Sequence, residues 1–165
     1  MSLWLLSWLL FRGGGKNRGN RMLQKVVRKM DIGATISSSG LITAKIRGPN
    51  HCAVTFYAEC DGKFLVVWTA LQINVKWESC TAYMLRLLLR RNVEQAFGRI
   101  GLQEGSIGGR IVMTECLEHA FLRPAKLRVI LEALIEQSRN LAYQLYAEGL
   151  VKRVSDWEDD PYAWS

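Results

Sequence analysis

Four cysteines and two histidines are the side chains of this chain best suited to metal or nucleophilic chemistry. They are Cys52, Cys60, Cys80, Cys116, His51 and His119. Successive cysteines are separated by 8, 20 and 36 positions, so no pair has the C-x-x-C spacing of a zinc knuckle or a redox loop. Each histidine stands beside a cysteine or a turn without a matching ligand motif. We therefore predict ordinary buried thiols in a reducing compartment, with no structural metal and no cofactor.

Neither the glycine pattern nor His119 matches a catalytic or phosphate-binding motif. Gly98 and Gly101 lie in a strand-like run, where glycine allows a bend or a close backbone approach. The glycine-rich turn over 105–109 joins two strands, whereas a phosphate-binding G-x-x-x-x-G-K-[ST] loop joins a strand to a helix. His119 follows Glu118 with no serine or cysteine arranged beside it, which argues against a catalytic dyad. The residues predict a protein that is not an enzyme.

Aromatic and arginine side chains are the remaining candidates for a binding surface. Phe56, Trp68, Trp77 and Tyr83 could stack on the bases of a nucleic acid, and packing in a core or interface explains such residues equally well. Arg99 could reach a ligand, but an ion pair with a nearby glutamate is the favoured interpretation. These residues leave both a nucleic-acid surface and a protein surface open, with protein the favoured partner.

The net charge of +7 is concentrated at the amino-terminal end. The first 30 residues contain seven of the 22 basic residues and none of the 15 acidic ones, so the remainder carries 15 of each sign. A neutral body with a basic end does not by itself indicate a nucleic-acid groove. The last residues lean the other way, with four acidic and three aromatic side chains: Asp156, Trp157, Glu158, Asp159, Asp160, Tyr162 and Trp164. Both ends are candidate recognition tails.

The opening 20 residues combine an apolar run with a glycine-rich basic linker. The run, 1–11, is too short to span a bilayer and lacks the features of a secretory signal. Two interpretations stay open: an interfacial anchor or partner-docking segment, and an upstream extension that does not fold with the body. The anchor would contact a membrane or nucleic acid through Trp4, Trp8, Arg12, Lys16, Arg18 and Arg21.

Two periodicities meet in the stretch from Met84 to Cys116. Leu85, Leu88 and Leu89 recur at helical spacing, which predicts an amphipathic helix over 80–92 lying on a core. Alternating apolar residues then follow on either side of the glycine-rich turn, which predicts two strands.

The other segments supply the elements around this stretch. The expected elements are a helix over 21–30, strands over 41–46, 52–57 and 63–68, the helix over 80–92, strands over 96–102 and 110–113, and a helix from Pro124 to about Gly149. Asp61-Gly62 between two β-rich runs is the strongest hairpin signal, and the third strand could extend through Ile73 and Val75 across a bulge. The order α-β-β-β-α-β-β-α predicts an α+β domain with a five-stranded antiparallel sheet.

This order resembles the type III secretion chaperone fold and, more closely, the YbjN-like family that shares it. The resemblance rests on the helix ending Leu87-Leu88-Leu89-Arg90-Arg91-Asn92, the strand Ala96-Phe97-Gly98-Arg99-Ile100-Gly101-Leu102, the glycine-rich turn, Arg110-Ile111-Val112-Met113, and the closing helix from Leu127 to Leu145. It covers roughly 21–149. The resemblance implies a homodimer through the central helix.

We therefore expect three segments: an apolar and basic extension over 1–20, a chaperone-like α+β domain over 21–150, and an acidic aromatic tail over 151–165. The expected function is a noncatalytic, cytoplasmic chaperone or adaptor that binds a protein or peptide partner. The alternative is a peripheral membrane or nucleic-acid-associated regulator that acts through the basic N-terminus. The candidate partner-binding residues are Trp68, Leu85, Leu89, Phe97 and Arg99.

Overall fold

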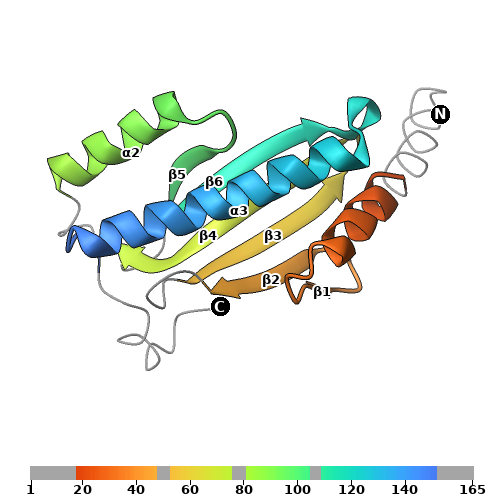
Figure 1. Ribbon diagram of the computed structural model, residues 1–165, viewed down its shortest axis with the longest axis horizontal. Coiled ribbons are helices and arrows are strands. Elements are labelled where there is room, and N and C mark those ends of the chain that lie inside the picture. Colours follow the sequence, from red (N-terminus) through yellow and green to blue (C-terminus); the bar gives the residue numbers. More distant parts are fainter. Residues whose placement is uncertain (1–17, 48–52, 76–80, 105–108, 152–165) are drawn as a thin grey trace, which may run out of the picture.

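The computed structural model describes residues 18–47, 53–75, 81–104 and 109–151. A twisted antiparallel sheet carries a long helix across one face (Figure 1). The elements are a helix over 18–29, β1 (Thr35–Ile36), β2 (Ile42–Arg47), β3 (Ala53–Asp61), β4 (Phe64–Val75), α2 (Ala82–Glu94), β5 (Arg99–Glu104), β6 (Gly109–Glu118), a 3-10 turn (His119–Phe121) and α3 (Pro124–Ala147). The strand order is β1-β2-β3-β4-β6-β5.

The predicted α+β class and element order are confirmed, with one strand more than expected. The sixth strand is β1, which has two residues and pairs Thr35 with Thr43 and Ile36 with Ile42. Two residues are too few to show the alternation that identifies a strand in a sequence. The glycine-rich turn expected over 105–109 lies mostly outside the described residues.

The β3–β4 hairpin forms where the sequence predicted it, but its loop is displaced by one residue. Asp61 pairs with Phe64, so the two loop residues are Gly62 and Lys63. Gly62 has a positive φ of 59°, as the first residue of a type II′ turn requires. His119 holds the turn, since its Nε2 lies 3.2 Å from the Gly62 carbonyl oxygen. This histidine therefore has a structural role.

The expected extension of the third predicted strand is also present. β4 continues to Val75, and its pairing with β6 shifts register between Ala70 and Asn74. Irregularities of this kind increase the local twist of a sheet.

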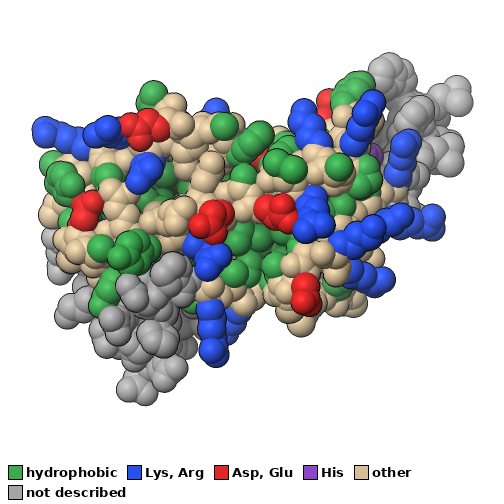
Figure 2. All heavy atoms as spheres, in the orientation of Figure 1, with side chains coloured by type: hydrophobic (Ala, Val, Ile, Leu, Met, Phe, Trp, Pro, Cys, Tyr) green, Lys and Arg blue, Asp and Glu red, His purple; other side chains and the backbone are tan. Residues whose placement is uncertain are grey.

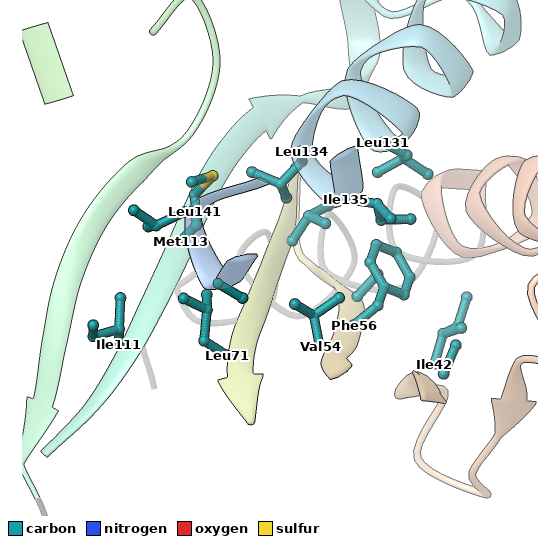
Figure 3. Packing of buried hydrophobic residues seen from close by; sticks show 14 of the residues in the cluster. Ile42, Val54, Phe56, Leu71, Ile111, Met113, Leu131, Leu134, Ile135 and Leu141 are labelled. Atoms are coloured by element: carbon teal, nitrogen blue, oxygen red, sulfur yellow. The ribbon is translucent and has the colours of Figure 1, made fainter. Parts of the chain in front are cut away.

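The core lies between the sheet and its helices. Apolar side chains from alternate positions of β2, β3, β4 and β6 meet the buried face of α3, as Figure 3 shows for Leu131, Leu134 and Ile135 above Val54 and Phe56. The helix over 18–29 adds three further buried side chains: Leu23, Val26 and Val27. All described helices therefore contribute to one core on the same side of the sheet.

Local signals set both ends of α3. Pro124 occupies the first turn, where its missing N–H leaves no helical acceptor unsatisfied. At the other end, the Leu150 N–H donates to the Leu145 carbonyl at 2.9 Å, and the Gly149 N–H donates to the Tyr146 carbonyl at 2.9 Å. With Gly149 at a φ of 68°, this is a Schellman C-cap. The chain leaves α3 in a defined direction, and Val151 is still 92% buried, since only 8% of it is exposed.

Candidate functional site

The helix α2 attaches to the body along one side only. Thr81 caps its start, where the Thr81 hydroxyl accepts a hydrogen bond from the Met84 N–H at 3.2 Å. Met84 and Leu88, one turn apart, are buried in the core. The sequence pattern had placed Leu85, Leu88 and Leu89 together on the core side, and this was wrong for Leu85 and Leu89. The true buried stripe is the Met84–Leu88 pair.

Asn92 joins the last turn of α2 to the edge strand β5. Its Oδ1 accepts a hydrogen bond from the Ile100 N–H at 2.6 Å, and its Nδ2 donates to the Ile100 carbonyl at 3.0 Å. One side-chain amide thus satisfies both backbone groups of Ile100 at the outer edge of the sheet. Edge groups of this kind otherwise invite pairing with another strand. Asn92 therefore positions α2 and closes part of the β5 edge.

The opposite side of α2 is an exposed apolar face. Leu85, Leu89 and Val93 follow one another at intervals of four residues and are 41%, 65% and 87% exposed. This spacing places them in one row along the helix. We call these three residues the α2 face. Val93 was missed as a candidate, although its spacing from Leu89 repeats that of Leu89 from Leu85.

Two arginines flank the α2 face on one side. Arg90 Nε lies 2.7 Å from Glu94 Oε1, whereas none of the ion pairs among the described residues involves Arg86. The hydrogen bond from Arg90, together with nearby positive charge, lowers the pKa of the Glu94 carboxyl below its ordinary value. Glu94 is therefore ionised at neutral pH and neutralises Arg90 in part. Arg86, beside the apolar row, has no such carboxylate partner in the ion pairs of the described residues.

Side-chain contacts hold α2 next to the carboxyl end of α3. A hydrogen bond with Glu148 raises the pKa of the Tyr83 hydroxyl at the start of α2. Arg91 donates to the side-chain carbonyl of Gln144 on α3. The residues that follow α3 therefore begin beside α2.

The sheet presents a second candidate surface on the face turned away from α3. A row of six paired residues crosses every strand there: Thr35, Thr43, Tyr57, Trp68, Thr114 and Arg99. The rings of Tyr57 and Trp68 stack at 5.2 Å between centroids and 10° between planes. Trp68 and Arg99 therefore share one face, separated by the width of β6. One face of the Trp68 ring is already covered by Tyr57.

Phe97 and Gly98 form the bend between α2 and β5. The predicted strand over 96–102 in fact begins at Arg99, so Phe97 precedes it and is half-buried. The Gly98 N–H donates to the Glu115 carboxylate, and Arg99 Nη1 donates to the Gly98 carbonyl at 3.0 Å. Among the described side chains, Arg99 thus contacts the backbone and forms no ion pair with Glu94. The other expected partner, the side chain of Glu104, lies outside what the structure describes.

The structure divides the five predicted partner-binding residues into separate places. Leu85 and Leu89 lie on the exposed side of α2, Trp68 and Arg99 lie on the sheet face away from α3, and Phe97 lies in the bend. The four aromatic residues considered as a base-stacking platform also lie in different places. Phe56 is completely buried in the core, Tyr83 lies on α2, and Trp77 lies outside the described residues. The described aromatics do not form a continuous base-stacking surface.

The basic N-terminal candidates are only partly described. Arg18 and Arg21 are exposed on the helix over 18–29, while Trp4, Trp8, Arg12 and Lys16 lie outside the described residues. Figure 2 shows Lys and Arg side chains gathered at the right of the view, over this helix and the start of α3. Within the described segments, no helix has both the length and the apolar character to cross a membrane.

The structure describes two of the four cysteines that were candidates for metal or redox chemistry. The prediction of buried thiols holds for Cys60, whose Sγ lies 3.6 Å from the Gly62 carbonyl oxygen. It is wrong for Cys116, which is exposed because it lies on the sheet strand β6 at a position turned away from the core. Cys52, Cys80 and His51 lie outside the described residues. No group of three His, Cys, Asp or Glu side chains suited to a metal ion occurs among the described residues.

Comparisons with known proteins identify the fold. No family model matches the sequence, and no curated protein matches it significantly. The crystal structure of YbjN from E. coli matches with a TM-score of 0.65 over 81% of this chain and 95% of that chain, at 10% sequence identity. The chain therefore has the YbjN-like fold. The ExsC–ExsE complex also matches, with a TM-score of 0.48, 14% identity, and coverage of 74% of this chain and 90% of that chain. The predicted resemblance to YbjN is confirmed at the level of the fold.

Proposed function

We propose that this YbjN-like domain is a noncatalytic chaperone or adaptor that binds a protein or peptide partner through the α2 face. The observation that carries the proposal is the row of Leu85, Leu89 and Val93, exposed on a helix whose other side is anchored in the core. Apolar rows on a rigid helix are typical protein-docking anchors. The anchoring contacts of Met84, Leu88 and Asn92 hold the row in place before any partner arrives.

The charges beside the α2 face define the chemistry of the partner. Arg86 and Arg90 lie along one flank of the row, so carboxylates on the partner would be attracted there. The expected partner segment combines apolar side chains, which contact Leu85, Leu89 and Val93, with acidic residues facing the arginines. The Trp68 and Arg99 row lies on the other face of the sheet and would serve a partner long enough to extend around the β5 edge.

Affinity capture from native lysate tests the proposal. The bait is the full-length chain, and a second bait begins at residue 17, because the described helix begins at residue 18. A version with Leu85→Glu and Leu89→Glu removes the α2 face, and Val129→Glu on α3 is the matched control, since Val129 is also exposed at 58%. A stoichiometric protein bound by both baits and by the control, but not by the α2 version, supports the proposal. Equal recovery by every version contradicts it.

A second copy of this chain is one protein partner that the α2 face could bind. Antiparallel pairing of two α2 helices would cover both apolar rows in a homodimer. The mass of the purified protein in solution tests this pairing: a dimer that becomes a monomer with Leu89→Glu supports it, and a monomer for the unaltered chain contradicts it.

A second candidate function rests on the basic N-terminal helix. Its exposed side carries only basic charges: Arg18, Arg21, Lys25, Arg28 and Lys29. Such a surface suits a membrane with anionic headgroups or a nucleic acid. Removal of residues 1–16 together with Lys25→Glu and Arg28→Glu would abolish liposome or nucleic-acid binding if this regulator function is correct. Binding that survives these changes, or that shows no salt dependence, contradicts it.

A further inference from the structure

We propose that the acidic aromatic tail, residues 152–165, folds back onto the α2 face and competes there with the external partner. The regulatory part of this proposal rests on the proposed function, whereas the intramolecular contact itself does not. Three features of the described residues lead to it: where the tail starts, what the α2 face offers, and how far the tail can reach.

The starting point of the tail lies beside α2. The Schellman cap at Gly149 directs the chain out of α3, and Val151 remains anchored in the core. Glu148, three residues earlier, hydrogen-bonds to Tyr83 at the start of α2. Residue 152 therefore follows directly from a segment that is held against the amino-terminal end of α2.

The tail and the α2 face have complementary chemistry. The tail contains three aromatic residues for an apolar row and four carboxylates for a basic flank: Trp157, Tyr162 and Trp164, with Asp156, Glu158, Asp159 and Asp160. Leu85, Leu89 and Val93 supply the apolar row, and Arg86 and Arg90 supply the flank. Trp157 has acidic neighbours on both sides in the sequence. An aromatic ring against Leu89 would therefore bring carboxylates close to the arginines.

The distance that the tail can span favours contact with α2 over contact with the basic helix over 18–29. Trp157 is six positions after Val151, so an extended chain carries Trp157 at most about 22 Å. The α2 face, from Leu85 to Val93, is about 12 Å long and begins beside the tail. The helix over 18–29 lies at the other end of α3 in Figure 1, where Gly19 packs against His119. Crossing the 24 residues of α3 requires about 36 Å, which exceeds the reach of Trp157.

The basic helix also lacks the apolar component. Its apolar residues Leu23, Val26 and Val27 are buried in the core, and Met22 is partly buried against it. All of its exposed residues are therefore basic. The α2 face offers charge and apolar surface together. The tail therefore fits α2 better on both distance and chemistry.

Cysteine accessibility in the full-length chain tests the contact without any partner. Val93→Cys places a thiol on the α2 face, and Val129→Cys places a matched thiol on α3. The rate of maleimide modification at each position is measured by peptide mass spectrometry, with the natural tail and with a tail carrying Trp157→Ala, Asp156→Asn and Glu158→Gln. We expect the natural tail to slow modification at position 93 by about tenfold, the factor that corresponds to 1.4 kcal/mol of docking, and to leave position 129 unchanged.

Two further arms locate the contact. Arg86→Glu with Arg90→Glu should restore fast modification at position 93, and Lys25→Glu with Arg28→Glu should not. Equal rates with the natural and altered tails overturn the proposal, as does a restoration caused by the Lys25 and Arg28 changes alone.

The outcomes distinguish a failure of the tail contact from a failure of the proposed function. Tail protection of position 93 without any captured partner keeps the contact and rejects the adaptor function. Partner capture by the α2 face with no tail protection rejects the contact and keeps the function. If both hold, the altered tail should capture more partner than the natural tail.

Discussion

Replacing Asn92 with alanine should loosen α2 from the sheet by a measurable amount. The change removes two hydrogen bonds to Ile100, one of 2.6 Å to its N–H and one of 3.0 Å to its carbonyl. Each contributes about 0.5–1.5 kcal/mol net, and alanine regains up to about 0.7 kcal/mol of helix propensity. The free energy of unfolding should therefore fall by about 1.5 kcal/mol.

Urea denaturation followed by tryptophan fluorescence measures this loss. Val93→Ala is the matched control, because it lies one position further along α2 and is 87% exposed, so its effect should stay within about 0.5 kcal/mol. Asn92→Asp keeps the acceptor but loses the donor and sets a carboxylate against the Ile100 carbonyl, and should also destabilise. Hydrogen exchange at the Ile100 amide should accelerate in both Asn92 variants. Unchanged stability and unchanged exchange for Asn92→Ala would refute the proposed role of Asn92 in positioning α2.

Two further predictions concern the bend and the charge pair. Gly98→Ala places a Cβ 2.7 Å from Leu134 Cδ1 at a φ of 77°, so strain and overpacking should together cost about 2–5 kcal/mol. Gly149→Ala, with a φ of 68° and open space around it, should cost only the strain of about 1–2 kcal/mol; equal losses in urea denaturation would contradict the packing at Gly98. The lowered pKa of Glu94 means that its folded state favours the carboxylate, so its pairing with Arg90 contributes above the unfolded pKa and is lost as pH falls through the folded one. The stability difference between the unaltered chain and Glu94→Gln should thus be small at neutral pH. It should begin to fall near the ordinary pKa of 4.5 and vanish once the pH is below the lowered pKa of the folded state. A difference that grows in acid would contradict this sign.

Most of the fold could be predicted from the sequence, because strong local signals mark its helix ends and turns. Pro124 and Gly149 bound α3 because each has a conformational preference that acts without tertiary context. The hairpin at Gly62 and the irregularity in β4 after Ala70 were also visible. β1 was not visible, because two residues carry no periodicity.

The candidate site was harder to predict from the sequence, because the side of α2 that is buried depends on where the helix packs against the sheet. Met84, Leu85, Leu88 and Leu89 are all compatible with an apolar stripe, and two different stripes can be drawn through them. Only the contacts with β5 and the core select Met84 and Leu88 as the buried pair. Those contacts are long-range, so local spacing could not decide which leucines stay exposed.

The placement of Trp68 and Arg99 on the sheet shows the same limit. Their common face follows from the register of β4 and β5 on either side of β6. The sequence gives the alternation along each strand but not the register between strands separated by a helix. Consequently the sequence could not show that the five candidate residues lie in three separate places, on α2, on the sheet face and in the bend.

The most direct test of the α2 face is the affinity of the captured partner for matched variants, measured by isothermal titration calorimetry on purified proteins. Leu89→Glu should weaken binding by about thirtyfold or more, as expected when a central anchor contributes about 2 kcal/mol. Val129→Glu on α3 should leave the affinity within about twofold, because surface changes outside an interface have small effects. Equal affinities for the two variants, or a larger loss for Val129→Glu, would contradict the assignment of α2 as the partner-binding surface.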